Sequence, residues 1–159
     1  MTRFELQPFD PADAELVSSW APTAQEVWTW VSRRTVPVPP DAIRDWAAEQ
    51  GSVTYLVHED GTPVAFGQVW LDDDEEDAEL ARLLVAPAHR GRGVGRRMVR
   101  ALTEVARQHR PHVAMRVAPG NEAALRSYAA AGFERVAPGL EQEWNQGQPV
   151  AFVWLRAVR

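Results

Sequence analysis

The chain has 159 residues, of which 45% are hydrophobic, and a formal net charge of −5, which favours one globular domain over residues 1–159 and argues against disorder. It contains no cysteine, which excludes a disulfide scaffold and a cysteine metal site. It also has no apolar run approaching about 18 residues and no apolar signal segment at its start, so we expect a soluble, cytoplasmic protein with no membrane partner.

Strand and helix patterns alternate along the whole chain. In the first half they predict a strand over 3–9, helices over 10–20, 24–33 and from 41, and a hairpin of strands over 53–59 and 64–71. In the second half they predict strands over 78–85, 112–117, 134–136 and 150–158, helices over 94–110 and 121–131, and a polar loop over 138–149. These patterns indicate a mixed α/β fold.

A glycine-spaced basic loop separates the strand that ends at Val85 from a helix that begins near Val94. It reads Arg90-Gly91-Arg92-Gly93-Val94-Gly95-Arg96. Its glycines allow the backbone to approach a ligand closely, and the helix start offers free N–H groups together with a partial positive charge. Arginines 90, 92, 96, 97 and 100 add positive charge that suits phosphate oxygens. The loop therefore predicts a pyrophosphate site.

Other glycine-rich motifs fit this loop poorly. A P-loop requires a lysine, and all 17 basic residues of this chain are arginine. The dinucleotide fingerprint places its third glycine one residue later than Gly95. An RNA-binding arginine-glycine tract remains an alternative, but the cluster is short and continues directly into an amphipathic helix. Because the whole chain is acidic, we expect no nucleic-acid partner.

Two segments together resemble the GNAT superfamily of acetyl-coenzyme A-dependent N-acetyltransferases. The first is Arg90-x-x-Gly93-x-Gly95 after Leu83-Leu84-Val85 and Pro87, and the second comprises Val117, Asn121, Ala124, Tyr128 and Gly132-Phe133. They cover about residues 79–133. The resemblance implies a GNAT-like α/β fold, with a central, mostly antiparallel mixed sheet of about six to seven strands flanked by four to five helices. It also implies acetyl-CoA as co-substrate and no metal.

The resemblance also implies roles for individual residues. The backbone of the strand before the loop would bind the pantetheine arm, the loop would bind the pyrophosphate, and Asn121 would contact the pantetheine or adenosine side. The residues concerned are Leu83, Leu84, Val85, Arg90, Gly91, Arg92, Gly93, Val94, Gly95 and Arg96. By position, Tyr128 would lie near the sulfur and protonate it.

Glu79 is the candidate general base. It lies four residues before Leu83, where some members of the family carry a glutamate, and partial burial there would raise its pKa toward neutrality. The alternative is that it ends the acidic run Asp72–Asp77 as a solvated residue. Another branch of the family has a glutamate where this chain has Arg116, which counts against a ribosomal-protein N-terminal acetyltransferase of that type.

The acceptor side is less defined by the sequence. Tryptophans 20, 28, 30 and 46 fall in the helical N-terminal region and either line an aromatic pocket or, more commonly, form core. The acidic run could attract a cationic amine, or it could be a solvated loop. The histidines show no metal-binding spacing.

The sequence therefore predicts an N-acetyltransferase that moves an acetyl group from acetyl-CoA to a primary amine of a small molecule or peptide. Because a cysteinyl intermediate is impossible, direct transfer in a ternary complex is expected. The alternative is a non-catalytic acyl-CoA-binding regulatory module. A homodimer is possible, since an exposed last strand often mediates dimers in this family.

Overall fold

The computed structural model describes residues 2–158. The strands are β1 (Phe4–Pro8), β2 (Ser52–Glu59), β3 (Thr62–Trp70), β4 (Asp77–Val85), β5 (His112–Val117), β6 (Phe133–Arg135) and β7 (Val153–Ala157). The α-helices are α1 (Ala14–Ser19), α2 (Ala24–Val31), α3 (Pro40–Ala48), α4 (Val94–Arg107), α5 (Glu122–Ala130) and α6 (Pro138–Trp144). Short 3-10 turns over Pro11–Asp13 and Pro87–His89 precede α1 and α4.

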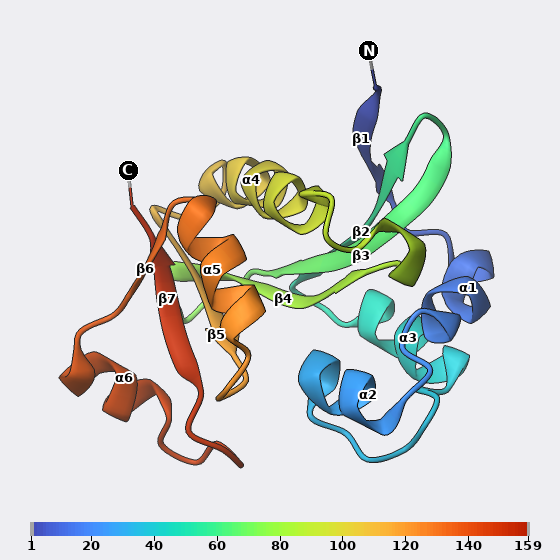
Figure 1. The fold of residues 1–159 in the computed structure, drawn as a ribbon. Coiled ribbons are helices and arrows are strands. Elements are labelled where there is room, and N and C mark those ends of the chain that lie inside the picture. Colours follow the sequence, from blue (N-terminus) through green and yellow to red (C-terminus); the bar gives the residue numbers. More distant parts are fainter. Residues whose placement is uncertain (1, 159) are drawn as a thin grey trace.

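All seven strands belong to one sheet, in the order β1-β2-β3-β4-β5-β7-β6 (Figure 1). Every neighbouring pair is antiparallel except β4 and β5, which are parallel. The helix α4 connects these two strands, as a parallel pair requires a crossover. The mixed, mostly antiparallel sheet predicted from the sequence is therefore confirmed.

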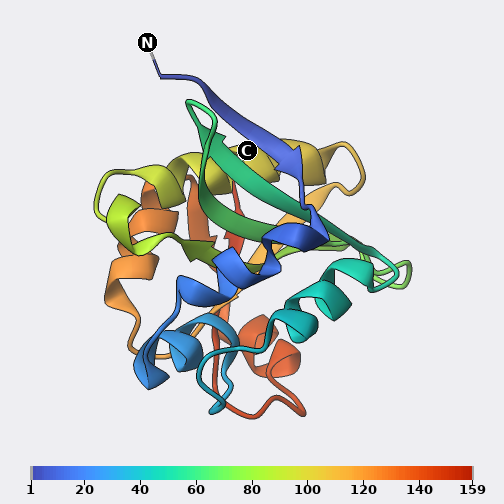
Figure 2. The ribbon, with the colours of Figure 1, turned by 90° about the vertical axis from the view of Figure 1, so that its right-hand side faces the viewer.

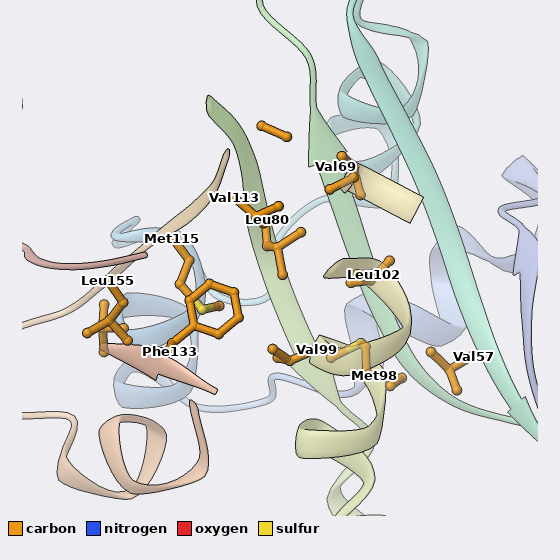
Figure 3. Close-up of a cluster of buried hydrophobic side chains, with 14 of the residues drawn as sticks. Val57, Val69, Leu80, Met98, Val99, Leu102, Val113, Met115, Phe133 and Leu155 are labelled. Carbon is orange, nitrogen blue, oxygen red and sulfur yellow. The ribbon is translucent and has the colours of Figure 1, made fainter. Parts of the chain in front are cut away.

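The sheet has a hydrophobic core on each face. On one face, Met98 and Leu102 of α4 pack against Val69 and Leu80 of the sheet (Figure 3). On the other face, α1, α2 and α3 cover Leu56, Phe66 and Leu84 with a second cluster that includes Val17, Val27 and Ile43. Figure 2 turns these three helices toward the viewer. Burial of a side chain of this size contributes roughly 1.5–3 kcal/mol, so both layers hold the central strands in place.

The parallel strands β4 and β5 pair over only part of their length. Their register joins Asp77–Leu80 to His112–Met115, while β4 continues to Val85 and β5 to Val117. The separation coincides with a bulge between β3 and β4, where Arg82 has a φ of 53°. Gly67 lies opposite the bulge, and a Cβ there would be 2.8 Å from Leu83 Cδ2 and 2.9 Å from Leu102 Cδ1. A larger residue at this position would force both leucine side chains to shift. Beyond Leu80, the end of β4 has no partner on the β5 side.

The C-terminal region differs from two sequence-based expectations. Residues 138–144, predicted as loop, form α6, which begins with Pro138 at its first position and places Trp144 against Trp154 at 5.0 Å between ring centres. The described chain accordingly has six α-helices rather than four to five. The last strand is not an exposed edge, because β7 pairs with β5 on one side and with β6 on the other. The expectation that the last strand is exposed is therefore wrong, and the homodimer itself stays a prediction.

None of the helices within residues 2–158 combines the length and the apolar character needed to cross a membrane.

Candidate active site

The larger cavity of the site is a cleft of about 490 Å³ at the point where β4 and β5 separate. Its walls come from α2, the end of β4, the loop before α4, the end of β5 and α5. The sequence-predicted residues in its lining are Leu83, Leu84, Val85, Arg90, Gly91, Gly93, Val94, Gly95, Asn121 and Tyr128. The fold thus brings ten of the thirteen predicted site residues into one cleft.

The start of α4 forms one end of this cleft. Gly91 and Gly93 have φ values of 74° and 82°, a conformation that costs other L-residues about 1–2 kcal/mol. Gly93 is the N-cap, has no side-chain cap, and is followed by a first turn without an acidic residue. The first-turn N–H groups, from Val94 onward, therefore remain available, with the helix dipole behind them, to an anion.

The arginines of the loop have different surroundings. Arg90 is held by the protein itself: its Nε donates to the Val85 carbonyl at 3.0 Å and its Nη2 to the Trp20 carbonyl at 2.7 Å, while Nη1 lies 3.3 Å from a Glu26 carboxylate oxygen. Arg90 therefore fixes the loop against α1 and α2, and these contacts occupy three of its five N–H donors.

The other arginines make fewer contacts with the protein's own acceptors. Arg92 and Arg97 are each 3.7 Å from the carboxylate of Glu59, and Arg100 donates to the Ala130 carbonyl. Arg96 is exposed and makes no hydrogen bond or ion pair within residues 2–158, and its Nη2 lies beside Gly93. Arg96 is therefore the side chain best placed to bind an anion at the helix start.

The end of β4 offers backbone groups to the cleft. The N–H of Ala86 donates to the Val64 carbonyl at 2.8 Å. Because backbone groups alternate between the two edges of a strand, Leu84 is directed toward β3, and Leu83 and Val85 are directed toward the open side. The Leu84 side chain is buried in the core beneath α2. The N–H groups of Leu83 and Val85 are therefore the ones available to an extended ligand, rather than that of Leu84.

The helix α5 places Asn121 and Tyr128 on the opposite wall. Asn121 is the N-cap, and its Oδ1 accepts from the Ala124 N–H at 3.2 Å. The hydroxyl of Tyr128 makes no hydrogen bond within the described residues, and burial raises the pKa of Tyr128 to about 12. This phenol therefore remains protonated at neutral pH and can donate a proton or a hydrogen bond into the cleft.

A second cavity, of about 300 Å³, adjoins the first. The two share Leu83, Arg116 and Tyr128. The lining of the second cavity also includes Trp70, Glu79, Arg82, Gln148 and Phe152. A molecule in each cavity would thus meet beside the Tyr128 side chain, which is the arrangement required for transfer of a group between two ligands.

Glu79 faces the second cavity as half of an ion pair. Its two carboxylate oxygens accept from Nε and Nη2 of Arg116 at 2.8 and 2.9 Å, and Arg116 Nη1 donates to Gln148 at 3.0 Å. The Glu79 side chain is only 17% exposed, so the alternative of a solvated residue is wrong. Burial raises the pKa of Glu79 above its ordinary value, and the Arg116 guanidinium opposes part of that rise.

The structure adds residues that the motifs did not single out. Arg82, Trp70 and Phe152 line the second cavity, and the only sequence signal for Arg82 was its charge within an apolar strand. Trp20, Trp30 and Trp46 are buried, so for them the core interpretation is correct. Trp30 also donates from Nε1 to the Arg82 carbonyl at 2.8 Å, which helps to fix the bulge.

Three features together are typical of a two-substrate transferase. They are a helix start whose amides are free for an anion, strand amides without a partner, and a second cavity that meets the first at a tyrosine. Residues 16–133 match the model of the acetyltransferase (GNAT) family. Because this match covers most of the chain, the protein belongs to that family, and the resemblance seen in the motifs is confirmed.

A curated relative is similar over part of the chain. The N-alpha-acetyltransferase RimI of Mycobacterium tuberculosis (strain ATCC 25618 / H37Rv) is 41% identical over 66 residues, which are 42% of this chain and 39% of the relative. The match therefore spans well under half of that relative's length.

Solved structures resemble the whole fold. A structure of AAC(6')-Ib with parmomycin and acetyl-CoA has a TM-score of 0.74 at 20% identity, covering 98% of this chain and 93% of that one. A ribosomal-protein-alanine N-acetyltransferase from Brucella melitensis has a TM-score of 0.73 at 18% identity, with 98% and 99% covered. A Vibrio cholerae spermidine N-acetyltransferase with CoA and spermine has a TM-score of 0.71 at 14% identity, with 84% and 82% covered. At these identities the likeness establishes the fold.

Proposed function

We propose that this protein transfers an acetyl group from acetyl-CoA to a primary amine directly, in a ternary complex. The observation that carries the proposal is the meeting of two cavities at Leu83, Arg116 and Tyr128. One cavity leads to the uncapped start of α4, and the other holds a carboxylate that can accept a proton. The family membership supports the same reaction.

The larger cleft fits the co-substrate. The first-turn amides of α4 and the exposed Arg96 would bind the diphosphate, whose charge the helix dipole also favours. The N–H groups of Leu83 and Val85 would pair with the pantetheine arm as an added strand does, and one of them would stabilise negative charge on the thioester oxygen. The acetyl thioester supplies an activated acyl carbon beside Tyr128.

Glu79 and Tyr128 would carry the two proton transfers. As the new C–N bond forms, the amine proton passes to the Glu79 carboxylate, directly or through one water. As the C–S bond breaks, the Tyr128 hydroxyl protonates the departing sulfur. A tyrosine with a pKa of about 12 is then reprotonated from solvent at neutral pH, and Glu79 returns its proton to solvent, so the cycle closes without net change in the protein.

The composition also supports direct transfer. With no cysteine in the sequence, the usual acyl-carrying thiolate is missing. Initial rates measured while both substrates are varied should give intersecting double-reciprocal lines, and the intact mass of the protein should be unchanged after incubation with acetyl-CoA alone. Parallel lines together with a stable acetyl adduct would contradict the ternary-complex mechanism.

The choice between an enzyme and a regulatory binding module rests on turnover. A panel of primary amines, which includes α-amino acids, peptide N-termini and polyamines, should be assayed by the release of the CoA thiol. Acetyl-CoA binding without thiol release from any member, and without any effect of Tyr128→Phe, would favour the binding module.

A further inference from the structure

The second cavity carries a positive charge that the protein compensates only in part. Its charged lining residues within the described chain are Glu79, Arg82 and Arg116. Arg116 is neutralised by its two-point pair with Glu79. Arg82 has only a single, longer contact, 3.7 Å from a carboxylate oxygen of the half-exposed Glu49. An exposed contact of this length is weak and screened. Arg82 also borders a neighbouring cavity whose lining includes Asp72, Asp73 and Asp74.

The Arg82 guanidinium is nevertheless held firmly. Its carbon lies 4.3 Å from the ring centre of Trp46 and 5.0 Å from that of Trp70, so the group is in contact with two indoles. Nη1 donates to Gln68 at 3.0 Å, which leaves most of the five guanidinium donors unused. The side chain is only 21% exposed, and burial lowers the pKa of Arg82. A partly buried cation with unused donors can bind an anionic ligand.

The backbone fixes the same group. Arg82 has a φ of 53° at the bulge of β4, which an arginine adopts only at a cost, and such strained residues concentrate at functional sites. The Trp30 indole donates to its carbonyl at 2.8 Å. Leu83, which follows Arg82 in the sequence, lines both cavities where they meet. The position of the guanidinium relative to the reaction site is therefore set before any ligand binds.

Arg82 and Arg116 stand around one indole. Their guanidinium carbons are 5.0 and 5.8 Å from the Trp70 ring centre. An anionic group bound by Arg82 would thus place a nearby amine beside the Glu79–Arg116 pair. Positive charge close to the amine also lowers its pKa and increases the fraction of neutral nucleophile, whereas a ligand with several ammonium groups would be repelled.

From these contacts we infer that the acceptor is a small amine carrying a carboxylate, such as a free α-amino acid, with its carboxylate on Arg82 and its amine toward Glu79 and Tyr128. The inference rests on the proposed acetyl transfer and assigns its substrate class. The cavity of about 300 Å³ suits a ligand of this size, at the lower end of small-molecule sites.

Matched acceptors test the inference. A panel of free L-amino acids is assayed first, and the best acceptor is then compared with its primary amide and its decarboxylated amine. The free acid should have a kcat/KM at least about tenfold above the other two, the scale of one hydrogen-bonded charge pair. Arg82→Gln should lower kcat/KM for the free acid and leave that for the amide and the decarboxylated amine nearly unchanged, so that the preference falls to near one. Arg126→Gln, which removes an exposed charge on α5 outside both cavities, should keep the preference.

Other results would overturn the inference. Amides, peptides, spermidine or kanamycin outperforming every free amino acid would reject it while leaving acetyl transfer intact. An absence of thiol release with all acceptors would reject the proposed function and the inference with it. Because Arg82→Gln also removes packing, Arg82→Lys serves as the second variant: it should restore part of the preference for the acid, and a Lys variant that folds but shows none would count against the carboxylate contact.

Discussion

Glu79 and Arg116 form a two-point ion pair at the fork of the sheet. The two N–H···O distances are 2.8 and 2.9 Å, and the pair lies where β4 and β5 cease to be hydrogen-bonded to each other. The Arg116 guanidinium carbon is also 4.6 Å from the ring centre of Trp154 and 5.4 Å from that of Phe152. The carboxylate is therefore held in one orientation at the edge of the second cavity.

Glu79→Gln should reduce kcat/KM about 100-fold or more, the usual contribution of a general base. The matched control is Asp77→Asn, which breaks an equivalent two-point pair with Arg156, at 3.0 and 2.9 Å, on the same strand but outside both cavities. Steady-state kinetics of both variants, with thermal unfolding to compare their stability, give the measurement. Equal losses of kcat/KM in the two variants would show that Glu79 only stabilises the sheet and is not the base.

The pH dependence of kcat/KM should report the same carboxyl. Burial raises the pKa of Glu79, so the base becomes protonated, and the rate falls, as pH decreases through a value above that of an ordinary glutamic acid. The acidic limb should disappear in Glu79→Gln. If the acidic limb were unchanged in that variant, it would arise from the titration of a group other than Glu79.

Tyr128→Phe should lower kcat by about 100-fold and leave acetyl-CoA affinity nearly unchanged, because the hydroxyl makes no hydrogen bond within the described chain. With its pKa raised to about 12, the phenol loses its proton only as pH rises through that value, so it should give no basic limb below pH of about 11. The chain's other tyrosine, Tyr55 on β2, supplies the control Tyr55→Phe. An unchanged kcat in Tyr128→Phe would show that Tyr128 is not the general acid.

The sheet and the phosphate end of the cleft could be predicted from the sequence because local patterns encode them. The glycine spacing from Gly91 to Gly95 and the apolar face of the following helix both act within a few residues. The mostly antiparallel sheet was implied by the family resemblance, whereas the strand order and the parallel β4–β5 pair are known from the structure. The short helix α6 was missed, since its Pro138 start and single Leu140–Trp144 apolar pair lie within a polar stretch.

The chemistry of the second cavity depends on contacts between distant residues. Arg116 pairs with Glu79, which is 37 positions away in the sequence, and the Arg82 guanidinium contacts the indole of Trp46 on α3. Neither contact follows from spacing along the chain, because each requires the tertiary arrangement of β4, β5 and α3. Glu79 was singled out as the candidate base, whereas its guanidinium partner and the place of Arg82 in the cavity lining were not predicted.

Gly93→Ala should weaken acetyl-CoA binding. The φ of 82° at this N-cap costs an alanine about 1–2 kcal/mol, and relief of that strain would move the first-turn amides. Gly139→Ala is the control, because Gly139 has ordinary φ and open space around its Cβ position within α6; it should be neutral or slightly stabilising. Titration calorimetry with acetyl-CoA measures both. Full affinity in Gly93→Ala would mean that the loop does not bind the diphosphate.

Substitution of two arginines of the loop should affect the stability of the protein differently. Arg90→Gln removes the contacts to the Val85 and Trp20 carbonyls and to Glu26, so we expect a loss of stability of about 1–3 kcal/mol because three hydrogen bonds are lost, one of them partly buried. Arg96→Gln removes an exposed side chain without a partner in the described chain, so the stability should stay within about 0.5 kcal/mol.

Affinity for acetyl-CoA separates the two roles further. Because Arg96 would act through charge at the surface, Arg96→Gln should lower the affinity several-fold in dilute buffer, and the difference from the unmodified protein should shrink as salt is added. In Arg90→Gln the weaker binding should persist at high salt, since it arises from a displaced loop. Denaturant unfolding and calorimetry at two ionic strengths provide the data, and a salt-independent defect in Arg96→Gln would place the diphosphate elsewhere.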